Sequence, residues 1–91
     1  MAALSITRKH RLSHAAAKAA AEQVAQDLRA RFDLAYTWEG DRIQFQRPGL
    51  TGALAVGKNE VRLDAELGFL LSALKPAIER EVHKEFDKRF G

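Results

Sequence analysis

The chain has 91 residues, of which 46% are hydrophobic, and its 15 basic and 12 acidic residues give a net charge of +3. This length suits a single domain, 1–91, with one core. The absence of cysteine excludes disulfides and thiolate metal sites and fits a reducing cytoplasm. No apolar stretch approaches the roughly 20 residues that cross a bilayer, and the N-terminus lacks the pattern of a secretory signal. We therefore expect a soluble, cytoplasmic protein without a transmembrane segment.

The first third of the chain predicts a strand followed by a helix. Leu4 and Ile6 alternate with polar residues, which is typical of a strand over 3–9. Ser13 can cap a helix, because its hydroxyl can accept a hydrogen bond from a free backbone N–H in the first turn. Apolar side chains then recur at spacings of three and four up to about Phe32, as one stripe: Ala17, Ala20, Ala21, Val24, Leu28 and Phe32.

Residues 35–67 predict four short strands. Gly40-Asp41 supplies a two-residue hairpin turn, Pro48-Gly49 suits a type II turn, and the cluster Gly57-Lys58-Asn59 separates the last two strands. Apolar and polar residues alternate throughout, with the apolar set at Tyr36, Trp38, Ile43, Phe45, Leu50, Leu54, Val56, Val61, Leu63, Ala65 and Leu67. Such regular alternation indicates an antiparallel sheet with one covered face and one wet face.

The last segment, from about Phe69 to Phe90, predicts a second helix with an apolar stripe. Its apolar positions recur every four residues, at Leu70, Leu74, Ile78, Val82 and Phe86. Pro76 lies inside this pattern, so we expect a kink or a restart there. The predicted fold is α+β in the order β-α-β-β-β-β-α, an antiparallel sheet of about five strands with two helices packed on one face.

The residues that could carry chemistry have structural interpretations. His10 and His14 have the spacing of paired metal ligands, but the capping Ser13 between them removes the shared helix face, so both read as surface or capping residues. His83 is expected on the solvated side of the last helix, among ordinary charged pairs such as Glu85 with Arg89. The serines lack a positioned base. We predict no catalytic residue, no metal, no cofactor and no enzymatic activity.

The wet face of the sheet is a candidate interaction surface for a partner or for a second copy of the chain, and a merely solvated face is the competing interpretation. It carries Arg42, Gln44, Gln46, Arg62, Asp64 and Glu66, with Thr37, Glu39 and Thr51. Nucleic acid is not favoured, because exposed sheets that bind RNA usually present aromatic side chains and this face has none. A basic patch gathering Arg8, Lys9, Arg11 and Arg47 would change that expectation.

Several short elements occur in the order of a known family: Ile6-x-Arg8-x-His10-x-Leu12-Ser13, Tyr36-x-Trp38-x-Gly40-Asp41, Phe45-x-Arg47-x-Gly49-x-x-Gly52 and Leu67-Gly68-x-Leu70-Leu71. With the alanine-rich helix, the chain resembles the polyhydroxyalkanoic acid system family, small bacterial proteins named for genes near those for polyhydroxyalkanoate storage granules. The resemblance implies a non-enzymatic accessory or binding protein, whose partner is the granule or a granule protein, and carries over no catalytic residue.

Two expectations complete this interpretation. Direct granule binding requires an exposed apolar patch. His10 is the first candidate site residue, because it belongs to the family pattern while the predicted local structure gives no reason for a histidine at this position. The alternative function is a small hydrophobic-ligand-binding protein or enzyme with a pocket between sheet and helices. A cavity lined by Trp38, Phe45 and the last helix would favour that alternative, and a filled core would not.

Overall fold

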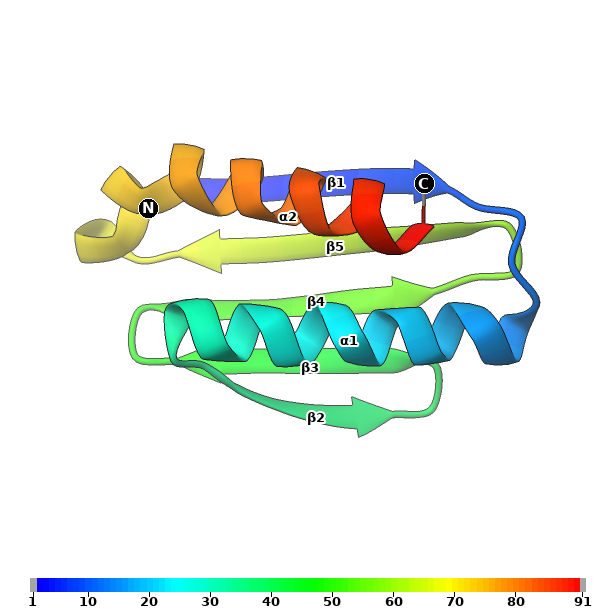
Figure 1. Cartoon of the computed structure of the whole chain (residues 1–91). Coiled ribbons are helices and arrows are strands. Elements are labelled where there is room, and N and C mark those ends of the chain that lie inside the picture. Colours follow the sequence, from blue (N-terminus) through cyan, green and yellow to red (C-terminus); the bar gives the residue numbers. More distant parts are fainter. Residues whose placement is uncertain (1, 91) are drawn as a thin grey trace.

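The structure, a computed structural model, describes residues 2–90. Within them, one antiparallel sheet of five strands carries two α-helices on a single face (Figure 1), which confirms the predicted α+β fold and element order. The elements are β1 (Ala2–Lys9), α1 (His14–Phe32), β2 (Ala35–Glu39), β3 (Arg42–Arg47), β4 (Leu50–Val56), β5 (Glu60–Leu67), the 3-10 helix η1 (Phe69–Leu74) and α2 (Lys75–Phe90).

The strands lie in the order β1-β5-β4-β3-β2, so the first strand pairs with the last and both β1 and β2 are edges. Helix α2 contacts β1, and helix α1 contacts β4 and β2. In Figure 1, α1 lies in front of β4 and β3, with β2 at the edge of the sheet. The register places one row of residues across the whole open face: Ser5, Asp64, Ala53, Gln44 and Thr37. Polar positions that are distant in sequence therefore share one surface.

Helix α1 begins and ends as its sequence indicates. The Ser13 hydroxyl accepts a hydrogen bond from the Ala16 N–H at 3.1 Å, and Asp33 ends the helix in the left-handed conformation. The alanines at positions 17, 21 and 25 are fully buried, and their small side chains allow the helix backbone to lie close to the sheet.

Tyr36 and Trp38 lie on the helix-covered face, as predicted, but are only partly buried because β2 is an edge strand. Their polar ends both reach Glu22 on α1, with the Tyr36 hydroxyl and the Trp38 indole N–H each 2.7 Å from a carboxylate oxygen. These hydrogen bonds, that of Trp38 first, lower the pKa of Glu22. Glu22 therefore fastens the edge strand to helix α1.

The last segment differs from its prediction at its start. Helix α2 begins at Lys75 and places Pro76 in its first turn, where a missing backbone N–H has no cost, so the predicted restart is confirmed. The apolar stripe was expected to include Leu70 and Leu74, and that prediction is wrong, because η1 lies beyond the end of the sheet (Figure 1) and these side chains have no core to enter.

Candidate functional site

Three apolar side chains of η1 project into solvent and form what we call the apolar tip: Phe69, Leu70 and Leu74. Their exposed fractions are 82%, 86% and 43%, while every other large apolar residue of β5 and α2 is buried. Single exposed leucines are ordinary, but adjacent large apolar residues exposed to this degree mark interaction surfaces. The apolar tip is therefore the exposed apolar feature of residues 2–90 to compare with the expectation of direct granule binding.

The apolar tip is held on the β3–β4 turn. The Gly68 N–H donates to the Gly49 carbonyl at 2.7 Å, and Leu71 packs back onto Gly49 so closely that a Cβ there would lie 3.2 Å from the Leu71 Cδ1. Gly49 also has a φ of +86°, a conformation that glycine adopts without strain. Because Leu71 points inward and anchors the turn, its neighbours Phe69 and Leu70 point outward.

The chain around the apolar tip is almost free of charge. Between Leu67 and Ile78 the only charged residue is Lys75, which lies 3.9 Å from Glu79. The Ser72 hydroxyl donates to the Phe69 carbonyl at 2.8 Å, so one of the few polar side chains of the segment is occupied internally. An apolar, nearly uncharged projection can enter an apolar phase without desolvating a row of charges.

His10 lies at the opposite end of β1 from the apolar tip, and it is buried rather than on the surface, with only 6% of the residue exposed. Its Nδ1 accepts the Leu12 N–H at 3.1 Å, its Nε2 lies 3.2 Å from the Gly57 carbonyl, and its ring packs 5.7 Å from that of Phe90. These contacts require the neutral ring with its proton on Nε2. They join β1, the β4–β5 turn and the end of α2.

His14 and His83 do not join His10. The His14 Nε2 lies 2.9 Å from the Asp41 carboxylate, which Lys18 also approaches to 3.4 Å, and His83 is exposed on α2 as expected. Among residues 2–90, no group of three or more His, Cys, Asp or Glu side chains could hold a metal ion.

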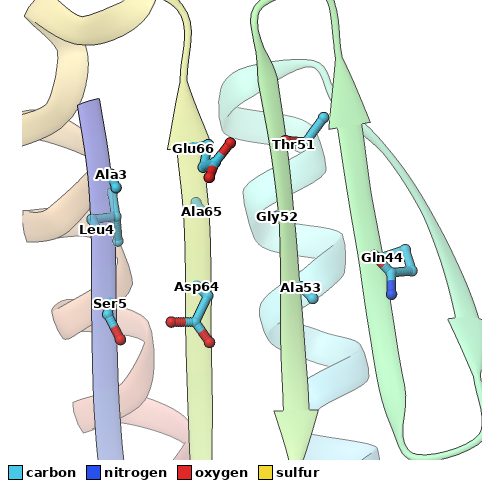
Figure 2. A pocket seen from close by; sticks show the side chains of 10 residues that line it. All are labelled: Ala3, Leu4, Ser5, Gln44, Thr51, Gly52, Ala53, Asp64, Ala65 and Glu66. Carbon is cyan, nitrogen blue, oxygen red and sulfur yellow. The ribbon is translucent and has the colours of Figure 1, made fainter. Parts of the chain in front are cut away.

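The candidate interaction face is assembled on the side of the sheet away from the helices. Arg42, Gln44, Gln46, Arg62, Asp64 and Glu66 all point to that side, by their register. An open hollow of about 460 Å³ lies at its centre. Figure 2 shows the side chains that line this hollow, among them the small residues Ala3 on β1 and Ala53 on β4. A hydrogen bond with Ser5 and the Arg62 guanidinium, whose Nε lies 2.9 Å away, lower the pKa of Asp64.

The four-residue basic patch does not form. Arg8, Lys9 and Arg11 gather near Arg89 around a hollow at the end of β1. Arg47 lies elsewhere, where its guanidinium donates to the Phe32 carbonyl at 2.6 Å beside the end of α1.

Sequence reasoning missed a charged cluster between the two helices. The expected i,i+4 pair of Glu85 with Arg89 is present. Its expected place on the solvated surface is wrong, because Glu85 is 5% exposed and faces α1. The Arg89 guanidinium donates to Asp27 on α1 at 2.8 Å and lies 3.7 Å from Glu85. The i,i+4 spacing of Glu85 and Arg89 is the only sequence signal, and spacing alone cannot report burial.

The family comparison gives a direct result. A family model described as "Putative polyhydroxyalkanoic acid system protein" matches residues 4–90. The chain belongs to this family. Comparison with curated proteins and comparison with solved structures gave no match. None of the helices within residues 2–90 is long and apolar enough to cross a membrane.

Proposed function

We propose that this polyhydroxyalkanoic acid system protein binds cytoplasmic polyhydroxyalkanoate granules directly, and that the apolar tip is the contact. The observation that carries the proposal is the exposure of Phe69, Leu70 and Leu74 on a segment that the rest of the fold holds outside the core. The family to which the chain belongs supplies the context. No catalytic step is part of the proposal.

The size of the tip indicates reversible binding. Burying one large apolar side chain contributes about 1.5–3 kcal/mol, so Phe69 and Leu70 together contribute a few kcal/mol before the cost of association. Contact of this strength resembles that of a protein held at an interface by a single short apolar segment. A granule presents many sites, so bound protein exchanges with free protein.

Co-sedimentation with isolated granules tests this function. Wild-type protein is expected in the pellet, and the double variant Phe69→Ser, Leu70→Ser is expected in the supernatant. Leu12→Ser is a matched control, because Leu12 is an exposed leucine, 37% accessible, in the loop after the far end of β1. It should pellet like the wild type. Wild-type protein that stays wholly in the supernatant would overturn the proposal.

A parallel arm with phosphatidylcholine vesicles separates a preference for the polyester from general adsorption to apolar interfaces. Sedimentation with granules but not with vesicles supports the granule as the ligand. Equal sedimentation with both would contradict a granule-specific contact. Thermal unfolding of the double variant should match the wild type, because both substituted side chains already lie in solvent.

The alternative function, a small-ligand pocket between sheet and helices, gains no support. The apolar space found there, between Phe45, Gly52 and Ile78, measures about 20 Å³. Ligand pockets have volumes of roughly 300–1,000 Å³. The core is filled at the place where the pocket was expected.

We propose that a second copy of the chain binds the wet face of the sheet. The reason is that negative and positive side chains of this face occupy different positions along the same strand. Glu66 and Arg62 lie on β5 four residues apart and point the same way. Two copies stacked face to face, with their β5 strands antiparallel, would place each Glu66 over Arg62 of the second copy. Five strands about 4.8 Å apart give a face on the order of 500 Å², which predicts a weak dimer.

Variants that exchange the charges of Arg62 and Glu66 test this dimer. Sedimentation velocity at increasing protein concentration measures the association of each variant. Arg62→Glu alone should abolish the concentration dependence, because it sets carboxylates against each other. The double variant Arg62→Glu, Glu66→Arg again places opposite charges against each other across the interface, and it should restore association. A wild-type chain that stays monomeric at all concentrations would contradict the proposal.

A further inference from the structure

Glu85 is the most deeply buried charged residue of helix α2, and one of its carboxylate oxygens, Oε1, has no hydrogen-bond partner among residues 2–90. It lines a groove of about 370 Å³ between helices α1 and α2, together with Asp27, Ala30, Arg31, Glu81, Lys84 and Lys88. A buried ionised carboxylate without full pairing is costly, so such a group tends to take up a proton.

The charged groups around Glu85 do not fully compensate a negative charge on its carboxylate. On α1, Asp27 is the nearest carboxylate and is already paired with Arg89 at 2.8 Å, while Arg31 pairs with Glu81 at 3.3 Å. On α2 itself, Arg89 approaches Glu85 only to 3.7 Å, and the Arg89 Nε also lacks a hydrogen-bond partner in the part of the chain that the structure describes. Lys84 and Lys88 are exposed. Glu85 therefore faces one carboxylate and one guanidinium that is engaged elsewhere.

We propose that Glu85 and Asp27 form a proton-dependent latch, which holds helix α2 against helix α1 while Glu85 is protonated and loosens it when Glu85 ionises. In the protonated state the Glu85 hydroxyl donates to the Asp27 carboxylate across the helix interface. In the ionised state two carboxylates face each other in a partly dry groove, and Arg89 cannot fully satisfy both.

The Glu85–Asp27 pair releases a proton at a pH near neutrality. Burial first, and then the hydrogen bond and the negative charge of Asp27, raise the pKa of Glu85 to about 7. The same hydrogen bond and Arg89 lower the pKa of Asp27, so the two carboxyls share one proton near neutrality. The latch thus responds to pH changes of about one unit around 7.

Opening of the latch would uncover apolar surface. Helix α2 buries Ile78, Val82 and Phe86 against the sheet, and it continues directly from η1. A loosened α2 presents these side chains to solvent or to an apolar surface. The inference itself concerns only the attachment of α2, and it stands whether or not the protein binds granules.

Amide hydrogen exchange followed by mass spectrometry tests the latch, with exchange times scaled for the intrinsic pH dependence of exchange. If Glu85 titrates at about 7 in the closed state and 4.5 in the open state, the opening constant of α2 should rise about tenfold between pH 6 and pH 8. In Glu85→Gln the rise should vanish. Equal protection of α2 at both pH values in the wild type would overturn the inference.

Two further variants keep the test decisive. In Asp27→Asn the pKa of Glu85 should fall, so the rise in the opening constant of α2 should move to lower pH. This variant tests the latch even if Glu85→Gln folds poorly. In His83→Gln the tenfold rise should persist, because His83 is exposed on the same helix but does not face the groove. A rise that His83→Gln abolishes would contradict the latch.

Discussion

The indole N–H of Trp38 on edge strand β2 donates to the Oε1 of Glu22 on helix α1 at 2.7 Å. The Tyr36 hydroxyl occupies the other carboxylate oxygen, also at 2.7 Å. One carboxylate thus connects two strand residues to a helix that otherwise contacts β2 sparsely. Edge strands without such attachment tend to fray or to pair with other chains.

Glu22→Ala should therefore destabilise the protein by about 1–3 kcal/mol, because hydrogen bonds to a charged group are lost and two donors are left without a partner. Urea unfolding followed by the fluorescence of Trp38, the single tryptophan, measures the loss. Gln23→Ala is the control, because the neighbouring residue is exposed on the same helix. Equal stability of the two variants would show that Glu22 does not secure β2.

A methyl group at Gly49 should disturb the apolar tip. Gly49→Ala and Gly40→Ala both place a side chain at positive φ, which costs about 1 kcal/mol in each. Of the two positions, only Gly49 brings the added Cβ against a neighbour, Leu71, since no atom of the described residues 2–90 lies within 4 Å of a Cβ at Gly40. We expect faster amide exchange in η1 and weaker granule sedimentation for Gly49→Ala than for Gly40→Ala. Identical behaviour would contradict the anchoring role of Leu71.

His10→Ala should lower stability without abolishing granule sedimentation. It leaves the Leu12 N–H and the Gly57 carbonyl without the ring and opens a space beside Phe90. We expect a loss of about 2–3 kcal/mol in chemical unfolding. His14→Ala removes an exposed contact to Asp41 instead and should cost well under 1 kcal/mol. Loss of granule binding by folded His10→Ala would give this residue the site role that the family pattern suggested.

The stability of the protein should fall as pH rises from about 4.5 to 7. The folded-state pKa of Glu85 lies above its usual value, so its contribution is fully present below about 4.5 and is lost as pH passes through 7. The pKa of Asp27 is lowered, so its contribution is lost only below about 4. Thermal unfolding between pH 5 and 8 should show a decline in the wild type that Glu85→Gln removes. A decline that survives in this variant would assign it to another group.

Much of the fold could be predicted because its signals are local. The alternation in β3 and β5, the Ser13 cap and the Pro48-Gly49 turn each depend on a few neighbouring residues, and the structure reproduces them. Pro76 correctly indicated a restart, since the effect of proline on a helix depends only on the preceding turn.

The errors share one cause, which is that burial depends on what lies opposite. Leu70 fits the same four-residue spacing as Ile78, yet it is exposed because η1 passes the end of the sheet while α2 lies over it. Glu85 has the spacing of a surface ion pair but is covered by α1.

The sequence by itself determined the strands, the helices and the two-sided sheet, because these follow from period and turn chemistry along the chain. Only the tertiary structure decided that Phe69 and Leu70 form an exposed tip, that His10 is enclosed by Phe90, and that Glu85 meets Asp27. Each of these relationships joins segments through the packing of layers, and no spacing within one segment contains that information.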